Sequence, residues 1–255
     1  MSIILSNEVD FQDPIFHFDS RIIQQLSDIS KLRPSIVQEK VIPLILEGKD
    51  VLVHASTGSG KTLSYVLPIC NELLPLTSQQ PSLSSVILVP TRELCQQVSK
   101  VLEETLWNCR DLIHRVIGVG GVDEEVPLLS PPPHILVSTP SRLKVHLSKH
   151  TLSLSSLKIL VLDEADLVLS YGYGDDIRYL LSQTPSSCQK VLLSATLSPE
   201  LSQLKKIALR SPAVVTLKDN TPSSSASQSL TSQHFLPLSS ANDKFLVLFS
   251  FLRLK

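Results

Sequence analysis

Short apolar runs alternate with amphipathic stretches along most of the chain. The runs are rich in Val, Ile and Leu and are continuously apolar, which is typical of strands buried on both faces of a parallel sheet. They lie at 50–54, 86–89, 115–119, 134–137, 158–162, 191–193 and 213–216. The periodicity over 92–106 and 199–209 predicts helices between them. This alternation predicts an α/β fold, a mostly parallel sheet with helices on both faces, whose ligands bind at the carboxyl ends of the strands.

The two ends of the chain differ from this middle part. We divide the chain into an N-terminal segment, a main domain, a serine-rich flexible linker and the truncated start of a second domain, at 1–38, 39–218, 219–233 and 234–255. The first segment contains an amphipathic stretch at 20–26. The last contains a predicted strand at 234–238 and an apolar predicted helix at 243–254.

Composition narrows the class of protein. The 255 residues are 42% hydrophobic and carry a net charge of −1, which excludes a chain that is disordered throughout. The apolar runs are far shorter than the ~20 residues of a membrane span, and the first residues do not resemble a signal peptide. The pI near 6.7 gives no overall signature of nucleic-acid binding. The four cysteines form no CxxC pair, which argues against a disulfide scaffold or zinc site and fits a reducing compartment; they are Cys70, Cys95, Cys109 and Cys188.

A glycine-rich loop follows the first predicted strand and opens a helix. It reads Ala55-Ser56-Thr57-Gly58-Ser59-Gly60-Lys61-Thr62. Gly58 and Gly60 allow backbone N–H groups to turn towards one centre, where they can bind phosphate together with a helix N-terminus. We expect Lys61 to reach the β- and γ-phosphates of a nucleotide and Thr62 to ligate Mg²⁺. Ala55 stands where the usual pattern has a glycine, and the alternative is an ordinary turn before a helix.

An acidic cluster, Asp163-Glu164-Ala165-Asp166, follows the buried run at 158–162. Beside a phosphate loop, Asp163 can hold Mg²⁺, partly through water. Glu164 can then orient and polarise an attacking water. The alternative is an acidic helix cap, a role that Asp166 could also have. The two sites together predict hydrolysis of a nucleoside triphosphate, with Lys61, Asp163 and Glu164 in catalytic roles.

Seven motifs, in this order, resemble those of the N-terminal RecA-like domain of the DEAD-box RNA helicases. They lie within 11–218 and are 33–38 (the Q motif), 55–62 (motif I), 90–94 (Ia), 120–121 (GG), 139–142 (Ib), 163–166 (II) and 194–196 (III). A closer likeness is to the subfamily of DEAD-box helicase 56, nucleolar proteins of large ribosomal subunit assembly. The stretches that suggest it are TPSR at 139–142, DEADLVLSYGYGDDI from Asp163, and DKFLVLFSFLRLK from Asp243.

The resemblance implies a site for ATP and Mg²⁺. Gln38 would read the adenine edge with its amide, which both donates and accepts hydrogen bonds. Phe11 would stack on the base, with Phe16 and Phe18 as alternatives, and Lys31 stands where the family usually has an aromatic residue. Mg²⁺ would be held by Thr62 and Asp163. The residues around the phosphates would be Ser56, Thr57, Gly58, Ser59, Gly60, Lys61 and Thr62.

The resemblance also implies a path for RNA and a coupling element. Sequence-independent contacts to the RNA backbone are expected from Pro90, Thr91, Arg92, Gly120, Gly121, Thr139, Pro140 and Arg142. Asp166, Ser194 and Thr196 would couple the nucleotide site to movement of a second domain. We interpret the acidic run at 123–125 as a solvated face.

The family implies an ATP-dependent RNA helicase, in which ATP binding and hydrolysis are coupled to RNA binding and local duplex unwinding. The subfamily implies ribosome biogenesis, with rRNA processing in the nucleolus, pre-ribosomal RNA and possible pre-ribosomal protein partners, and a monomer. An arginine finger is worth roughly 10³ to 10⁵ in rate, and the family supplies it from the second domain. We therefore expect this chain alone to bind ATP and hydrolyse it slowly. The alternative is a truncated, non-catalytic ATP- or RNA-binding module, and Gln38 together with 163–166 disfavours a DNA-directed motor.

Overall fold

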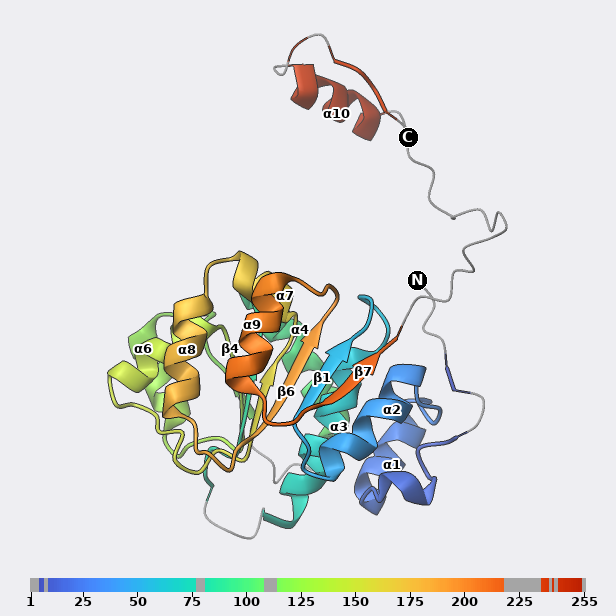
Figure 1. The fold of residues 1–255 in the computed structure, drawn as a ribbon, viewed down its shortest axis with the longest axis vertical. Coiled ribbons are helices and arrows are strands. Elements are labelled where there is room, and N and C mark those ends of the chain that lie inside the picture. The colour runs from blue at the N-terminus through green and yellow to red at the C-terminus, as the bar shows by residue number, and fades with distance from the viewer. Residues whose placement is uncertain are drawn as a thin grey trace. The chain divides into compact units, whose positions relative to one another are not determined.

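The described part of the chain is built on one parallel sheet. The computed structural model describes residues 5–6, 9–76, 81–107, 114–217, 235–238, 240 and 243–253. The strands are β1 (Val51–His54), β2 (Ser85–Leu88), β3 (His114–Val116), β4 (Ile135–Ser138), β5 (Ile159–Leu162), β6 (Gln189–Ser194) and β7 (Ala213–Thr216). They pair in parallel in the order β3-β4-β2-β5-β6-β1-β7, of which Figure 1 shows β6, β1 and β7 side by side. The predicted α/β fold is confirmed.

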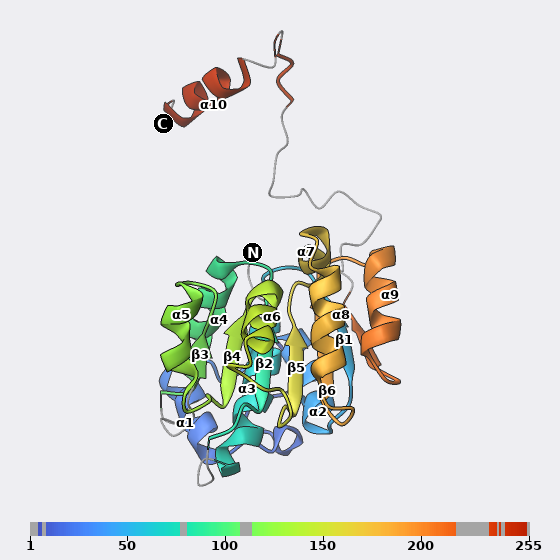
Figure 2. The same cartoon turned by 90° about the vertical axis from the view of Figure 1, so that its left-hand side faces the viewer.

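Helices cover both faces of this sheet (Figure 2). One face carries α1 (Ser20–Asp28), α2 (Ile36–Leu46), α3 (Lys61–Leu73) and α4 (Arg92–Thr105). The other carries α6 (Pro140–Ser148), α7 (Ala165–Ser170), α8 (Gly174–Gln183) and α9 (Pro199–Ala208). The short elements are α5 (Val122–Glu125) and the 3₁₀ turns η1 (Pro14–Phe16), η2 (Leu74–Leu76) and η3 (Val126–Leu129).

The core consists of two apolar layers, one on each face of the sheet. Val51 and Val53 belong to the layer beneath α1 to α4, whereas Leu52 between them belongs to the layer beneath α6 to α9. Successive side chains of a strand point to opposite faces. Since both faces are covered by helices, the central positions of the inner strands are apolar, which explains the continuous runs in the sequence.

The N-terminal segment is part of the main domain. The chain divides into two compact units, 1–218 and 219–255. Phe16, Ile22 and Leu26 are each no more than 1% exposed and pack in the core of the first unit. The boundary that we placed after residue 38 therefore does not separate a structural unit, because the apolar side chains of α1 and α2 belong to the same core layer as those of α3 and α4.

The second unit is described in part. Its described helix, α10 (Asp243–Arg253), agrees with the predicted one, and none of its residues is buried. The strand predicted at 234–238 is wrong for 235–238, which pair with no strand in the described part of the chain. A single extended segment has no neighbour for its backbone groups, so apolar residues alone do not form a strand. The predicted linker at 219–233 lies outside the described residues. Among the described helices, none has the length and apolar character needed to cross a bilayer.

The strand order divides the carboxyl edge of the sheet into two halves. In the first half, β5, β6 and β1 are neighbours, and the chain leaves them into the acidic cluster, residues 194–196 and the glycine-rich loop. In the second half, β3, β4 and β2 are neighbours and lead to 117–121, 139–142 and 90–94. The motifs are therefore sorted in space: those matching a nucleotide site lie together, and those matching an RNA path lie together.

Backbone hydrogen bonds continue the sheet past the strand ends at this edge. The Ala55 N–H donates to the Ser194 carbonyl (3.1 Å), and the Asp163 N–H donates to the Leu88 carbonyl (2.9 Å). The second bond joins the acidic cluster after β5 to the end of β2. The two halves of the edge thus meet where the segment after β5 is hydrogen-bonded to the end of β2.

Candidate functional site

The glycine-rich loop encloses a lysine. β1 ends at His54 and α3 begins at Lys61, with Gly58 (φ +77°) and Gly60 (φ +93°) in left-handed conformations that favour glycine. Lys61 is 6% exposed, and its Nζ donates to the carbonyls of Ala55 (2.7 Å) and Ser56 (3.0 Å). Burial lowers the pKa of Lys61, while neighbouring carboxylates act in the opposite direction. The loop therefore holds a cation at its centre, as phosphate binding requires.

The loop and the acidic cluster line one hollow of about 330 Å³. Its lining includes Lys61, Thr62, Asp163 and Glu164, which belong to segments far apart in the sequence. Gly58, Gly60 and Thr57 also line it, together with apolar side chains of α4. The structure thus brings together the predicted phosphate-binding and acidic residues at the carboxyl edge of the sheet.

A buried tyrosine holds the first carboxylate of the cluster. Asp163 is 6% exposed, and its Oδ2 accepts a hydrogen bond from the Tyr65 hydroxyl (2.8 Å). Burial raises the pKa of Asp163, and the Tyr65 hydrogen bond lowers it. Burial and the charge of Asp163 raise the pKa of Tyr65 well above its usual range, so this hydroxyl remains a donor. The sequence analysis did not identify Tyr65; its place one helical turn after Lys61, on the same face of α3, is the available signal.

The second carboxylate has an unusual backbone. Glu164 adopts φ +49°, in the left-handed region, at the start of α7. This turn begins at the end of β5, and the Glu164 N–H donates to Asp163 Oδ1 (2.9 Å). Burial, followed by the charge of Asp163, raises the pKa of Glu164. A side chain with a raised pKa in a hollow beside a buried lysine is a candidate for proton transfer or water activation.

Replacing Tyr65 with phenylalanine should weaken binding of Mg²⁺–ATP, and more so at low pH. The hydroxyl stabilises the ionised form of Asp163, so its loss raises the pKa of Asp163 further, and the acidic limb of the binding profile moves to higher pH. One hydrogen bond is worth about 1 kcal/mol, or about fivefold in affinity. Titrations from pH 5.5 to 8 would measure this, with Tyr179→Phe on α8 as the control. Parallel profiles for the two variants would contradict the assignment.

The three predicted coupling residues are in direct contact. Asp166 Oδ2 accepts hydrogen bonds from both the N–H (3.1 Å) and the hydroxyl (2.8 Å) of Thr196. The Ser194 hydroxyl donates to the Thr196 carbonyl (2.7 Å). The end of β6 is thereby tied to the acidic cluster after β5.

Gln38 and Phe11 have contacts within the chain that the sequence analysis did not anticipate. The Gln38 amide accepts from the Ser35 N–H (2.8 Å) and donates to the Gly60 carbonyl (2.9 Å). It thus links the cap of α2 to the phosphate loop, and adenine reading stays a prediction. Phe11 is 1% exposed, with its ring packed against Phe16 (5.5 Å between centroids) and Phe18 (6.1 Å). Stacking of Phe11 on a base would require these core contacts to break.

The other half of the edge carries a second hollow, of about 500 Å³. Five of the residues predicted for RNA line it: Pro90, Thr91, Arg92, Thr139 and Arg142. Glu93, Gly118, Val122, Ser141, Val145, Tyr171 and Tyr173 line it as well. The sequence analysis did not identify Gly118, although its φ of +105° makes glycine the favoured residue there.

The remaining predicted residues for RNA have other positions. Pro140 is buried as the first residue of α6, where it has no N–H to offer. The Gly121 N–H donates to the Glu124 carboxylate (2.9 Å), and the Gly120 carbonyl accepts from Arg142 (3.0 Å). The interpretation of 123–125 as a solvated face is wrong for Glu125, which is 3% exposed, because its carboxylate is enclosed by partners from neighbouring segments.

Comparison with known proteins agrees with this geometry. Residues 35–204, more than half of the chain, match the family described as DEAD/DEAH box helicase. The chain belongs to this family. The DEAD-box chain is 43% identical over 243 residues to a probable ATP-dependent RNA helicase ddx56 of Dictyostelium discoideum. The aligned region covers 93% of this chain and 35% of that protein. The chain is 39% identical over 267 residues to the ATP-dependent RNA helicase DBP9 of Cryptococcus neoformans, covering 99% and 42% respectively. It is also 39% identical over 256 residues to dbp9 of Schizosaccharomyces pombe, covering 98% and 42%.

The family resemblance inferred from the seven motifs is therefore confirmed. The DEAD-box chain spans between 35% and 42% of the length of these three relatives. All three carry the name ATP-dependent RNA helicase, the first as a probable one.

Proposed function

We propose that this chain is the ATP-binding part of an ATP-dependent RNA helicase, in which ATP binding and hydrolysis control RNA binding and local separation of a duplex. One observation carries the proposal. A hollow that contains a buried lysine and two carboxylates lies at the same end of the sheet as a second hollow, which is lined by residues of the family's RNA motifs. The names of the relatives support it.

In the nucleotide hollow, each group has a role that its chemistry allows. The loop N–H groups and the N-terminus of α3 bind phosphate oxygens. Lys61 leaves its two carbonyl partners and neutralises the β- and γ-phosphates. Glu164 accepts a proton from, or orients, the attacking water. The raised pKa of Glu164 places it closer to the working pH than an ordinary carboxylate.

The residues present fit a magnesium ion. Among the described residues there is no group of three or more His, Cys, Asp and Glu side chains that could hold a metal. Mg²⁺ at phosphate sites is usually bound by one or two protein groups, the phosphates and water. Thr62 and Asp163 line the same hollow and supply a hydroxyl and a carboxylate. When bound there, Mg²⁺ would neutralise charge on the phosphates.

The second hollow suits the backbone of a single strand. Arg92 and Arg142 offer guanidinium groups, and Thr91, Ser141 and Thr139 offer hydroxyls, all of which suit phosphate and sugar oxygens. Such contacts do not read base edges, so we expect binding without sequence preference. Contacts to 2′-hydroxyls would favour RNA over DNA.

For the cellular context, we propose ribosome biogenesis, with pre-ribosomal RNA as substrate, pre-ribosomal proteins as further partners, and a monomer in the nucleolus. The support is the spelling of 139–142, 163–177 and 243–255, together with similarity to the Dictyostelium relative named ddx56.

The test of the proposed function measures ATP hydrolysis and binding of fluorescent single-stranded RNA by the whole chain. We expect ATP to bind in preference to GTP, and RNA to bind more tightly with a non-hydrolysable ATP analogue. Lys61→Ala should remove both the ATP signal and its effect on RNA. A chain that binds ATP but no RNA would contradict the helicase proposal, and one whose nucleotide signals do not depend on Lys61 would contradict the site.

A further inference from the structure

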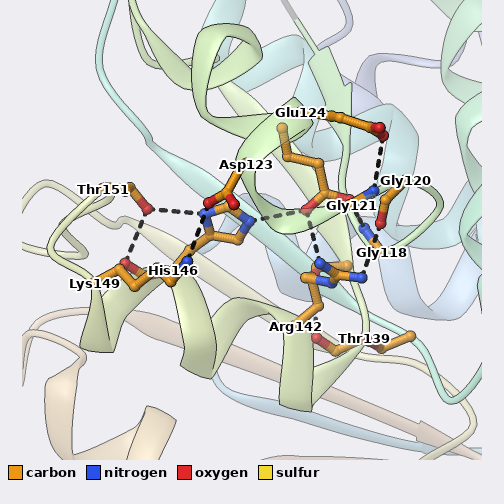
Figure 3. A network of polar contacts seen from close by, with 12 residues as sticks. Gly118, Gly120, Gly121, Asp123, Glu124, Thr139, Arg142, His146, Lys149 and Thr151 are labelled. Atoms are coloured by element: carbon orange, nitrogen blue, oxygen red, sulfur yellow. Dashed lines mark hydrogen bonds and ion pairs between the residues drawn. The ribbon is translucent and has the colours of Figure 1, made fainter.

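A buried carboxylate lies beside the second hollow, outside the motifs assigned to RNA. The Glu125 side chain, at the end of α5, is 4% exposed. A buried charge of this kind is costly unless it is paired and hydrogen-bonded. Its Oε1 accepts from the Gly118 N–H at 2.7 Å, which fixes the loop that follows β3 (Figure 3). Gly118 adopts φ +105°, in the left-handed region, two residues after the last residue of β3 (His114–Val116).

The other oxygen of Glu125 faces α6. Its Oε2 lies 2.9 Å from His146 Nε2, and the His146 side chain is fully buried. This contact pairs the imidazole with the carboxylate inside the protein. The other ring nitrogen, Nδ1, lies 2.8 Å from the Thr151 hydroxyl, which is also 3.0 Å from the His146 carbonyl. The imidazole is therefore held at both ends and fixes the distance between α5 and α6.

The same carboxylate sets the position of an arginine in the proposed RNA surface. Arg142 Nη1 lies 3.7 Å from Glu125 Oε2, and Arg142 Nη2 donates to the Gly120 carbonyl at 3.0 Å. The Arg142 side chain is 15% exposed and lines the second hollow. A guanidinium has five N–H groups, so these two contacts orient it without using its capacity to donate to a phosphate.

We propose that Glu125, braced by His146, is a positioning residue for RNA binding. It holds the loop at 118–121 and the Arg142 guanidinium in one arrangement, so that their polar groups meet the RNA backbone without first being ordered. This inference rests on the proposed RNA-binding function. Two segments that are separate in the sequence converge on this one side chain: the loop after β3 contributes Gly118, and two successive turns of α6 contribute Arg142 and His146 (Figure 3).

Positioning and simple charge predict opposite outcomes for one substitution. Removing a negative charge near a polyanion should strengthen binding if charge alone matters. If Glu125 positions the surface, Glu125→Gln should weaken binding of single-stranded RNA by about tenfold, because a neutral amide cannot serve three donors as strongly. Asp123→Asn on the same helix is the matched control: its side chain is 93% exposed and pairs with Lys149 (3.2 Å), and the same charge is removed.

The experiment titrates fluorescent oligouridine into the whole chain, with ATP affinity measured for each variant. We expect Asp123→Asn to bind RNA within twofold of the unmodified chain or more tightly. Glu125→Asp should be weakened like Glu125→Gln, because the shorter side chain keeps the charge but cannot span Gly118 and His146. ATP affinity should stay within twofold for all three variants, since the nucleotide hollow lies in the other half of the edge. RNA binding of Glu125→Gln that equals or exceeds that of Asp123→Asn would overturn the proposal.

Two further measurements distinguish failure of the proposed RNA-binding function from failure of the proposed role of Glu125. Hydrogen exchange at 117–121 should be faster in Glu125→Gln and unchanged in Asp123→Asn. If the unmodified chain binds no RNA, the proposed function fails, whereas unchanged exchange in Glu125→Gln shows that Glu125 does not hold the loop. If Glu125→Gln also loses ATP binding, Thr151→Val decides, because it removes the hydroxyl that contacts His146 Nδ1 and the His146 carbonyl and leaves Glu125 itself unchanged. RNA binding two- to threefold weaker with normal ATP binding supports positioning, and no change in either overturns it.

Discussion

Gly60→Ala should weaken ATP binding strongly. A Cβ at residue 60 would lie 2.7 Å from Gln38 Nε2 and 2.8 Å from Ser35 Oγ, and the backbone there has φ +93°. The left-handed conformation costs an L-residue roughly 1–2 kcal/mol, and overpacking adds typically ~1–3 kcal/mol. Both are relieved if the loop moves away from the N-terminus of α2, which turns its N–H groups from the phosphate position. We expect affinity to fall by at least about 30-fold, the equivalent of ~2 kcal/mol.

Gly48→Ala is the control for this result. Gly48 has a similar φ of +73°, but a Cβ there would meet nothing within 4 Å, and the residue lies outside the site. It should lower the free energy of unfolding by about 1–2 kcal/mol and leave ATP affinity unchanged. Isothermal titration calorimetry and thermal unfolding of both variants would measure the two effects. Normal ATP affinity in Gly60→Ala would show that the contact between the loop and 35–38 does not shape the phosphate site.

Glu164→Gln should lower the rate of ATP hydrolysis by about 10² to 10⁴-fold, the usual contribution of a positioned acid–base group. The amide keeps the size of the side chain and the left-handed turn, but it cannot take a proton. Asp163, Lys61 and the loop are unchanged, so ATP affinity should stay within about threefold. A single-turnover assay with excess protein and saturating RNA is sensitive enough to follow the slow reaction.

Glu200→Gln provides the comparison for this second variant, because Glu200 is an exposed residue in the first turn of α9. It should hydrolyse ATP at the unmodified rate. Equal rates for Glu164→Gln and the unmodified chain would assign the chemistry to another group, and parallel loss of ATP affinity would show that Glu164 acts in binding.

Much of the fold could be predicted because the decisive pattern is local. Both faces of the sheet are covered, so the inner strands are largely apolar, and each of the seven predicted runs overlaps a strand. The exceptions have tertiary causes. β3 ends at Val116 rather than at residue 119, and the Gly118 N–H donates to a carboxylate seven residues later instead of to a neighbouring strand. The apolar run at 235–238 has no partner for its backbone among the described residues.

The site divides in the same way. The phosphate loop and the acidic cluster are contiguous motifs, and the strand ends bring them together as expected. The bond between Tyr65 and Asp163 joins residues 98 positions apart, and that between Glu125 and His146 joins residues 21 apart. Neither pair belongs to a periodic pattern or a short motif. Such supporting partners are set by how two elements pack, which one sequence alone does not reveal.

The backbone hydrogen bonds that continue the sheet at its carboxyl edge also decide where the chain can tolerate inserted residues. Asp163 is joined to Leu88, at the end of β2, in the same ladder that aligns β2 with β5. One residue inserted within either strand would turn the following side chains to the opposite face and carry Asp163 or the segment after Leu88 out of its hollow. The number of residues in β2 and β5 therefore fixes the position of one hollow relative to the other. Insertions can be accommodated instead in the connections at the opposite edge of the sheet, where neither hollow depends on the count of residues.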